Sequence, residues 1–167
     1  MTILVTWSCR FIGFNLILKL SKKVKIVGLD NINNYYDTKL KYKRLSLLKK
    51  KKNFKFYKID ICKKKSLEKV IKKHRPKIIY HFAGQAGVQH SIFFPEKYLQ
   101  NNINGFFNIL EIAKEQNIKK IIFASSSSVY GDQKISPLNE KMIIKPKNFY
   151  GMSKKNNEEM AQIYSEL

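Results

Sequence analysis

The chain has 167 residues, of which 44% are hydrophobic and 13% aromatic. This length and composition predict one domain with a real core and exclude general disorder. The formal charge of +21 would suit a polyanionic partner, but 30 of the 33 basic residues are lysines and only three are arginines. Phosphate-reading proteins usually rely on the bidentate fork of arginine. We therefore attribute the lysine excess to AT-rich codon usage and expect no nucleic-acid site.

Two cysteines, Cys9 and Cys62, are too few for a disulfide framework, which favours a reducing, cytoplasmic compartment. Residues 3–20 are mostly apolar and could imitate a signal peptide. No basic segment precedes them, and Arg10 and Asn15 interrupt the run. We interpret this region as a strand followed by a helix, and we expect neither a membrane partner nor a metal site.

Apolar, β-rich runs alternate with helical patterns along the whole chain. In chain order we predict a strand at Ile3–Thr6, a helix at Ile12–Leu20, a strand at Val24–Gly28, a helix at Asp37–Leu48, a strand at Phe54–Lys58, a helix at Ser66–His74, a strand at Ile78–Phe82, a helix at Pro95–Glu115, a strand at Lys120–Ala124 and a helix at Phe149–Leu167. Ser66 is expected to cap its helix. The alternation predicts an α/β fold, a doubly wound parallel sheet of the Rossmann type with strand order 3-2-1-4-5.

A tyrosine and a lysine lie four residues apart where the last helix begins. Tyr150 and Lys154 share one helix face at this spacing, and a nearby ammonium group favours the phenolate form of tyrosine. Such a pair can exchange a proton with a substrate hydroxyl. The preceding strand ends in Ser125–Ser128, and the carboxyl ends of parallel strands are where open α/β sheets bind ligands. Two surface residues and a polar loop remain the plainer interpretation of the same pattern.

Several motifs in order resemble the extended short-chain dehydrogenase/reductase family, in its nucleotide-sugar epimerase/dehydratase branch. They are Tyr150-Gly-Met-Ser-Lys154 after Ser-Ser-Ser-Ser-Val-Tyr-Gly, Gly28-Leu-Asp-Asn-Ile-Asn-Asn-Tyr-Tyr-Asp37, His81-Phe-Ala-Gly-Gln-Ala-Gly-Val88, and Asn102 with Gly105-Phe-Phe-Asn-Ile-Leu-Glu111. Within that branch the chain is most similar to UDP-glucuronate 4-epimerases. The resemblance extends over essentially all 167 residues.

The resemblance implies the roles of individual residues. Tyr150 would be the acid/base, Lys154 its partner and a ligand of the nicotinamide ribose, and Ser126 the hydrogen-bond partner of the reacting sugar oxygen. The NAD site would comprise Phe11, Ile12, Gly13, Asp30, Asn31, Asp60, Ile61, Ala83, Gly84, Tyr150 and Lys154. The UDP-sugar site would comprise Gln85, Val88, Ser126, Ser127 and Ser128. Independently of the resemblance, a carboxylate that ends the second strand, Asp30, favours NAD over NADP because it repels a 2′-phosphate.

Dehydratases of this fold carry Thr-Asp-Glu where this chain has Ser126-Ser127-Ser128. Without that acid pair, the resemblance implies a 4-epimerase that oxidises carbon 4, lets the ketone rotate and returns hydride to its other face. Gln89 stands where a basic residue is expected in uronate epimerases. This leaves the preference for a uronic acid open.

The first turn departs from the family pattern Thr-Gly-x-x-Gly-x-x-Gly. The chain reads Thr6-Trp-Ser-Cys-Arg-Phe-Ile-Gly13, so that only Gly13 remains. We expect Trp7 and Arg10 to weaken NAD binding, and we expect the double substitution to glycine to restore it. Genuine loss of the glycines and a local change of reading frame both explain the departure, since GGT-GGA-GCT read in a shifted frame contains TGG-AGC, which encodes Trp-Ser.

Members of the family are about twice as long as this chain. We therefore expect residues 1–167 to form an incomplete NAD-binding domain that lacks a sixth strand and the C-terminal substrate domain, as a fragment, an interrupted gene or a degenerate product. One alternative is an inactive remnant that at most forms a homodimer through helices 95–115 and 149–167. A second is a polyanion-binding module, which a steep dependence of binding on salt would reveal.

Overall fold

The computed structural model describes residues 1–20, 22–134 and 136–167. The chain forms two compact units. Unit 1 comprises Met1–Ala83 and Ile112–Phe123, and unit 2 comprises Gly84–Glu111 and Ala124–Leu167. No helix within the described ranges is both long enough and apolar enough to cross a membrane.

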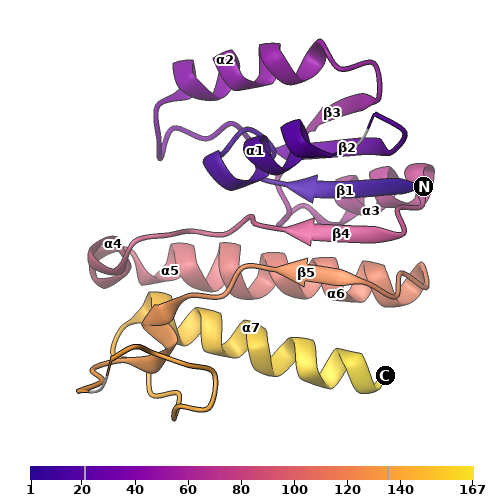
Figure 1. Cartoon of the computed structure of the whole chain (residues 1–167). Coiled ribbons are helices and arrows are strands. Elements are labelled where there is room, and N and C mark those ends of the chain that lie inside the picture. Colours follow the sequence, from indigo (N-terminus) through magenta and orange to yellow (C-terminus); the bar gives the residue numbers. More distant parts are fainter. Residues whose placement is uncertain (21, 135) are drawn as a thin grey trace. The chain divides into compact units, whose positions relative to one another are not determined.

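Unit 1 is built on a parallel five-stranded sheet with the order β3-β2-β1-β4-β5 (Figure 1). The strands are β1 (Thr2–Thr6), β2 (Lys25–Asp30), β3 (Phe54–Lys58), β4 (Ile78–His81) and β5 (Ile121–Phe123). In the central strand, Val5 pairs with Gly28 on one side and with Tyr80 on the other. The predicted α/β class and the predicted strand order are therefore confirmed.

Helices cover both faces of this sheet. Ile17 of α1 (Phe11–Lys19) and Leu48 of α2 (Thr38–Lys49) pack against Ile3, Val5 and Ile26 on one face. Because successive side chains of a strand point to opposite faces, the buried Leu4 and Val27 belong to the other face. In Figure 1, α3 (Lys64–His74) lies behind the sheet while α1 lies in front.

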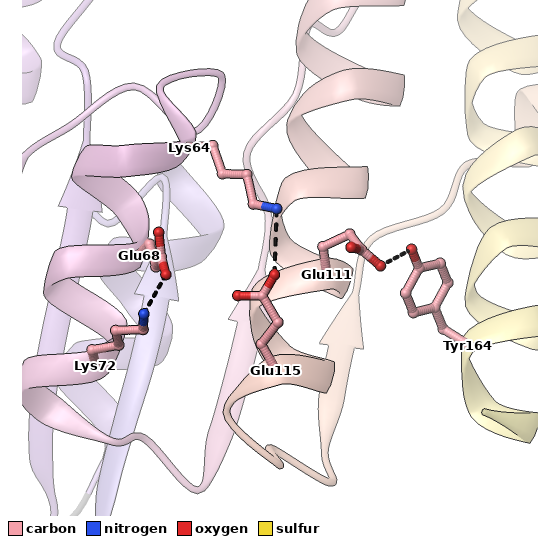
Figure 2. Close-up of polar contacts among 6 residues, drawn as sticks. All are labelled: Lys64, Glu68, Lys72, Glu111, Glu115 and Tyr164. Carbon is pink, nitrogen blue, oxygen red and sulfur yellow. Dashed lines mark hydrogen bonds and ion pairs between the residues drawn. The ribbon is translucent and has the colours of Figure 1, made fainter.

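The start of α3 corrects one prediction. The helix begins at Lys64, and the amide of Ser66 donates to the carbonyl of Lys63 within the first turn (3.0 Å). Ser66 is therefore inside the helix, and the prediction that it caps the helix is wrong. Two ion pairs involve this helix: Lys64 pairs with Glu115 (3.4 Å), and Lys72 pairs with Glu68 one turn earlier (2.5 Å). Both pairs are drawn in Figure 2.

Unit 2 contains the remaining helices. They are α4 (Val88–Phe93), α5 (Pro95–Tyr98), the π-helix η1 (Leu99–Asn104), α6 (Gly105–Glu115, whose end belongs to unit 1), the 3₁₀ helix η2 (Ser127–Tyr130) and α7 (Phe149–Glu166). The predicted helix at Pro95–Glu115 is thus present, but its middle is π-helical. Neither α4 nor η2 was predicted. Tyr164 of α7 donates a 2.5 Å hydrogen bond to Glu111 of α6 (Figure 2).

Candidate functional site

The turn between β1 and α1 has a glycine-like backbone conformation at one of the two positions where glycine is replaced. Trp7 has a φ of 53°, a left-handed conformation that an aromatic residue rarely adopts and that glycine adopts without strain. A Cβ atom on Gly13 would collide with the carbonyl oxygen of Trp7. The close approach of α1 to the turn therefore depends on the third glycine. Phe11 and Ile12 at the start of α1 are exposed.

The carboxylate of Asp30 joins this turn to the loop after β2. It accepts hydrogen bonds from the backbone amides of Cys9 (3.1 Å) and Ile32 (2.9 Å). Burial, followed by the charge of Asp30, raises the pKa of the Cys9 thiol to about 12. The thiol is thus protonated and unreactive at neutral pH.

The other predicted cofactor residues of unit 1 continue from Asp30 along the sheet edge. Asn31 donates a 3.3 Å hydrogen bond to Asp60, which also accepts from the amide of Cys62 (2.9 Å). Ile61 is buried beside it. Ala83 is tied to the end of β1, because its amide donates to the hydroxyl of Thr6 at 2.9 Å. Unit 1 therefore brings the β1–α1 turn, Asp30, Asn31 and Asp60 into one hydrogen-bonded edge.

Arg10 fills space in this turn. Its guanidinium carbon lies 4.0 Å from the ring centroid of Trp7 and 4.0 Å from that of Tyr36. The side chain is buried, and its Nε and Nη2 atoms have no hydrogen-bond partner. Burial lowers the pKa of Arg10, while the nearby Tyr36 and Asp30 act in the opposite direction. The ring centroid of Tyr35 lies further off, at 5.8 Å, so that three cation–π contacts stabilise this buried charge.

In unit 2 the predicted acid/base pair, Tyr150 and Lys154, lies in the first two turns of α7. Asn148 caps the helix by accepting from the amide of Gly151 (2.8 Å), and Tyr150 is half-buried in the first turn. Lys154 lies one turn further on, buried, and its Nζ donates a 2.9 Å hydrogen bond to the carbonyl oxygen of Ala124. Burial lowers the pKa of Lys154 to about 8. At pH 7 the amino group therefore still carries its proton.

The serines that follow β5 lie against the same helix end. Ser126 caps η2, and its Oγ accepts from the amide of Ser128 at 3.2 Å. A Cβ atom on Gly151 would collide with the carbonyl oxygen of Ser128, so that η2 sits directly on the first turn of α7. Ser126 and Ser128 are half-buried, whereas Ser127 is exposed. The structure thus brings Ser126 and Ser128 to the turn that carries Tyr150.

A buried amide holds the remaining predicted residues of unit 2 in place. Asn102 of η1 accepts from the amide of Gln85 (2.5 Å) and donates to the carbonyl of Gln85 (3.0 Å) and to the hydroxyl of Ser153 (2.8 Å). The next residue after Ala83, Gly84, packs against the same amide. The side-chain Nε2 of Gln85 is buried without a partner. The site prediction omitted Asn102, although an amide inside an apolar helical run is a signal for it.

Tyr98 completes this arrangement. Its hydroxyl donates to the carbonyls of Ala86 (2.8 Å) and Gly87 (2.6 Å), directly before Val88 and α4. Its ring meets the ring of Tyr150 edge-on, with centroids 6.1 Å apart. The chain segment that carries Gln85 and Val88 is therefore anchored beside the proposed acid/base. Within the described residues no group of three or more His, Cys, Asp or Glu could hold a metal ion.

A parallel sheet of this order, followed by a Tyr-x-x-x-Lys pair on the helix after the fifth strand, defines a dinucleotide-binding domain of the short-chain dehydrogenase/reductase class. Residues 4–167 match the family model described as GDP-mannose 4,6 dehydratase, and the chain belongs to that family. The resemblance to the epimerase/dehydratase branch is thus confirmed.

Relatives and solved structures agree on the branch. A UDP-glucuronate 4-epimerase of Thermodesulfobacterium geofontis is 39% identical over 166 residues, which are 98% of this chain and 51% of that protein. The UDP-Glc/GlcNAc 4-epimerase of Campylobacter jejuni superposes with a TM-score of 0.90 at 26% identity, over 99% of this chain and 49% of that one. A UDP-glucuronic acid 4-epimerase of Bacillus cereus, solved in complex with UDP-glucuronic acid and NAD, gives 0.88 at 31% identity, over 99% and 52%. The chain spans about half the length of the relatives it matches.

Proposed function

We propose that this chain is the NAD-binding half of a nucleotide-sugar 4-epimerase and that the sugar nucleotide is a UDP-sugar of the UDP-glucuronate kind. The observation that carries the proposal is the buried Lys154 at the start of α7, fixed to Ala124 one helical turn from Tyr150. A buried ammonium at this position is costly for a purely structural helix. It has a chemical use beside a phenol that must lose and regain a proton.

In the proposed reaction Tyr150 acts as the acid/base. Its phenolate oxygen takes the proton of the C4 hydroxyl. It returns this proton after the 4-keto sugar has rotated to present its other face. Lys154 stabilises the phenolate by its charge. Ser126 donates to the C4 oxygen and aligns it with Tyr150. NAD, when bound, would accept the hydride from carbon 4 and give it back to the opposite face of the ketone.

The backbone conformation of the β1–α1 turn in unit 1 is compatible with binding of a dinucleotide. The glycine-like φ of Trp7 and the tight contact at Gly13 preserve the turn that a diphosphate requires. Asp30 would hold the adenosine ribose, with Asn31, Asp60 and Ile61 next to the adenine. Phe11 and Ile12 would offer backbone amides, and Ala83 and Gly84 would line the path toward the nicotinamide. Lys154 and Tyr150 would contact its ribose.

Epimerisation is favoured over dehydration although the family model carries a dehydratase name. Loss of water needs an additional acid, and the residues at the corresponding positions are Ser126, Ser127 and Ser128. The half-buried hydroxyls of Ser126 and Ser128 can donate hydrogen bonds to a sugar but cannot supply a proton at neutral pH. Gln85 and Val88 would contact the sugar from the segment that Asn102 holds.

We further propose that two copies associate through the helices at 95–115 and 149–167, in the cytoplasm. Several apolar side chains on these helices are more than 40% exposed, namely Leu99, Phe107, Phe149, Ile163 and Leu167. An apolar surface of this kind marks an interaction site where the side chains form one continuous patch, and we propose that they do so on these helices. Both cysteines are free thiols, which fits a reducing compartment. Light scattering of the purified chain tests the homodimer.

The proposed activity is tested on a chain completed with the C-terminal half of the Thermodesulfobacterium geofontis relative. The fused protein, with Trp7 and Arg10 replaced by glycine, is incubated with UDP-glucuronate and NAD. Conversion of the sugar to its C4 epimer, followed by NMR of the anomeric proton, is the expected result. Loss of water from UDP-glucuronate, or an unchanged sugar although NAD binds, would contradict the proposal.

A further inference from the structure

Two aromatic rings from different parts of unit 1 lie nearest to the guanidinium group of Arg10, and a third ring, that of Tyr35, lies further away at 5.8 Å. Trp7 belongs to the β1–α1 turn and Tyr36 to the loop between β2 and α2, and each ring centroid lies 4.0 Å from the guanidinium carbon. Arg10 is only 8% exposed. We call the pair Trp7 and Tyr36 the aromatic clamp. The clamp closes the space between turn and loop with a positively charged side chain.

The carboxylate of Asp30, whose charge acts on Arg10, is covered as well. Asp30 is 2% exposed, and its two oxygens accept from Cys9 and Ile32, one on the turn and one on the loop. A ribose can exchange hydrogen bonds with Asp30 only if its hydroxyls reach the carboxylate. Because Asp30 is this deeply buried, the groups that cover it must move before a ribose binds there.

We propose that Arg10 is an autoinhibitory plug: held by the aromatic clamp, it occupies the place of the adenosine diphosphate part of NAD and must leave the clamp before the dinucleotide binds. This inference rests on the proposed function, because it concerns the same cofactor site. It differs from a role of Arg10 as a phosphate ligand, in which the arginine would add to the affinity for NAD instead of reducing it.

The contacts around Arg10 give its clamped position only a modest net stabilisation. Its Nε and Nη2 atoms are buried without an acceptor, which offsets part of the gain from the cation–π contacts. Lys41 and Arg44 add positive charge near the same group. Tyr36 is 50% exposed, so that its removal releases the plug without opening the core. The clamp can thus be weakened by one surface substitution.

The test compares NAD binding by calorimetry in the 167-residue chain and four variants. Tyr36→Ala removes one face of the clamp, and Tyr36→Phe is the matched control that keeps the ring. Arg10→Gly removes the plug itself, and Trp7→Gly with Arg10→Gly restores the glycine turn. Circular dichroism checks that each variant is folded. Trp7 is the sole tryptophan, so its fluorescence reports on the clamp without any label.

A cation–π contact at a desolvated site corresponds to about a three- to thirtyfold change in a binding constant. We expect NAD affinity to rise by that range in Tyr36→Ala, to rise further in Arg10→Gly and to equal the parent in Tyr36→Phe. Saturating NAD is expected to change Trp7 emission in the parent, because Arg10 leaves the indole.

Three results would overturn the inference. If Arg10→Gly binds NAD more weakly than the parent, Arg10 is a ligand and not a plug. If the double glycine variant binds NAD but Tyr36→Ala equals the parent, the plug is wrong while the proposed cofactor site stands. If no variant binds NAD, the proposed function fails and the plug fails with it.

Discussion

The amino group of Lys154 is fixed by the carbonyl oxygen of Ala124, 2.9 Å away, and not by a carboxylate. Ala124 is the first residue after β5 and the start of the second segment of unit 2, so this hydrogen bond links that segment to the start of α7 within unit 2. A carbonyl oxygen neutralises no charge, and the only cause of the lowered pKa of Lys154 is burial. The charge of Lys154 is therefore left to act on a group bound beside it.

The lowered pKa of Lys154 predicts a dependence of stability on pH. Between about pH 8 and 10.5 the unfolded chain holds a proton on Lys154 that the folded chain has released. Stability should therefore rise with pH across this window by up to about 3 kcal/mol relative to Lys154→Met, which has no proton to release. Urea unfolding of both proteins at pH 8 and pH 10 measures this. A difference between the two proteins that is the same at both pH values would show that the amino group is not desolvated.

Asn102→Ala should destabilise the chain strongly. The substitution leaves the amide and the carbonyl of Gln85 without their partner, while the hydroxyl of Ser153 keeps its bond to the carbonyl of Tyr150 (2.8 Å). Each buried unsatisfied group costs about 1–3 kcal/mol. We expect a loss of about 2–4 kcal/mol in urea unfolding. Asn101→Ala, at the neighbouring and more exposed position, is the control and should cost less than about 1 kcal/mol. Equal losses in the two variants would contradict the role assigned to Asn102.

Gly151→Ala should separate η2 from α7. The new Cβ atom meets the carbonyl oxygen of Ser128, which is backbone and cannot rotate away. Overpacking of this kind typically costs about 1–3 kcal/mol. Lys155→Ala is the control on the same helix, since it removes only an exposed ion pair with Glu159 (3.5 Å) and should cost about 0–1 kcal/mol. Thermal unfolding measures both, and an unchanged melting temperature in Gly151→Ala would mean that η2 packs elsewhere.

The sheet could be predicted because the strands other than β3 are short, mostly apolar runs, as expected where both faces of a sheet are covered, and β3 alternates apolar residues with lysine. Val5, for example, lies between Gly28 and Tyr80 in the middle of the sheet and is fully buried. The order of the strands follows from right-handed crossovers and needs no knowledge of side-chain contacts. Boundaries moved by one or two residues, as at β2, which continues to Asp30.

Features that depend on contacts between distant residues could not be predicted. The π-helical η1 lies inside a run with an ordinary helical pattern, and Asn102 within it meets its partners 17 and 51 positions away. The cap expected at Ser66 failed because α3 starts two residues earlier without any side-chain cap. From the sequence, Arg10 could be identified as a bulky residue at a position where the family pattern has glycine. The contact of the Tyr36 ring with the Arg10 guanidinium could be found only in the structure.

The central claim is that Tyr150 exchanges the proton of the sugar, and Tyr150→Phe in the completed, glycine-restored enzyme tests it most directly. The substitution keeps the ring that meets Tyr98 and removes only the oxygen. General acid–base catalysis is worth about 10²–10⁴-fold, so turnover of UDP-glucuronate should fall at least by that range while NAD affinity is retained. Ser126→Ala should cost less, because water can replace its hydroxyl, and Ser165→Ala on the last turn of α7 is the control. Turnover by Tyr150→Phe at the rate of the Ser165→Ala enzyme would contradict the account.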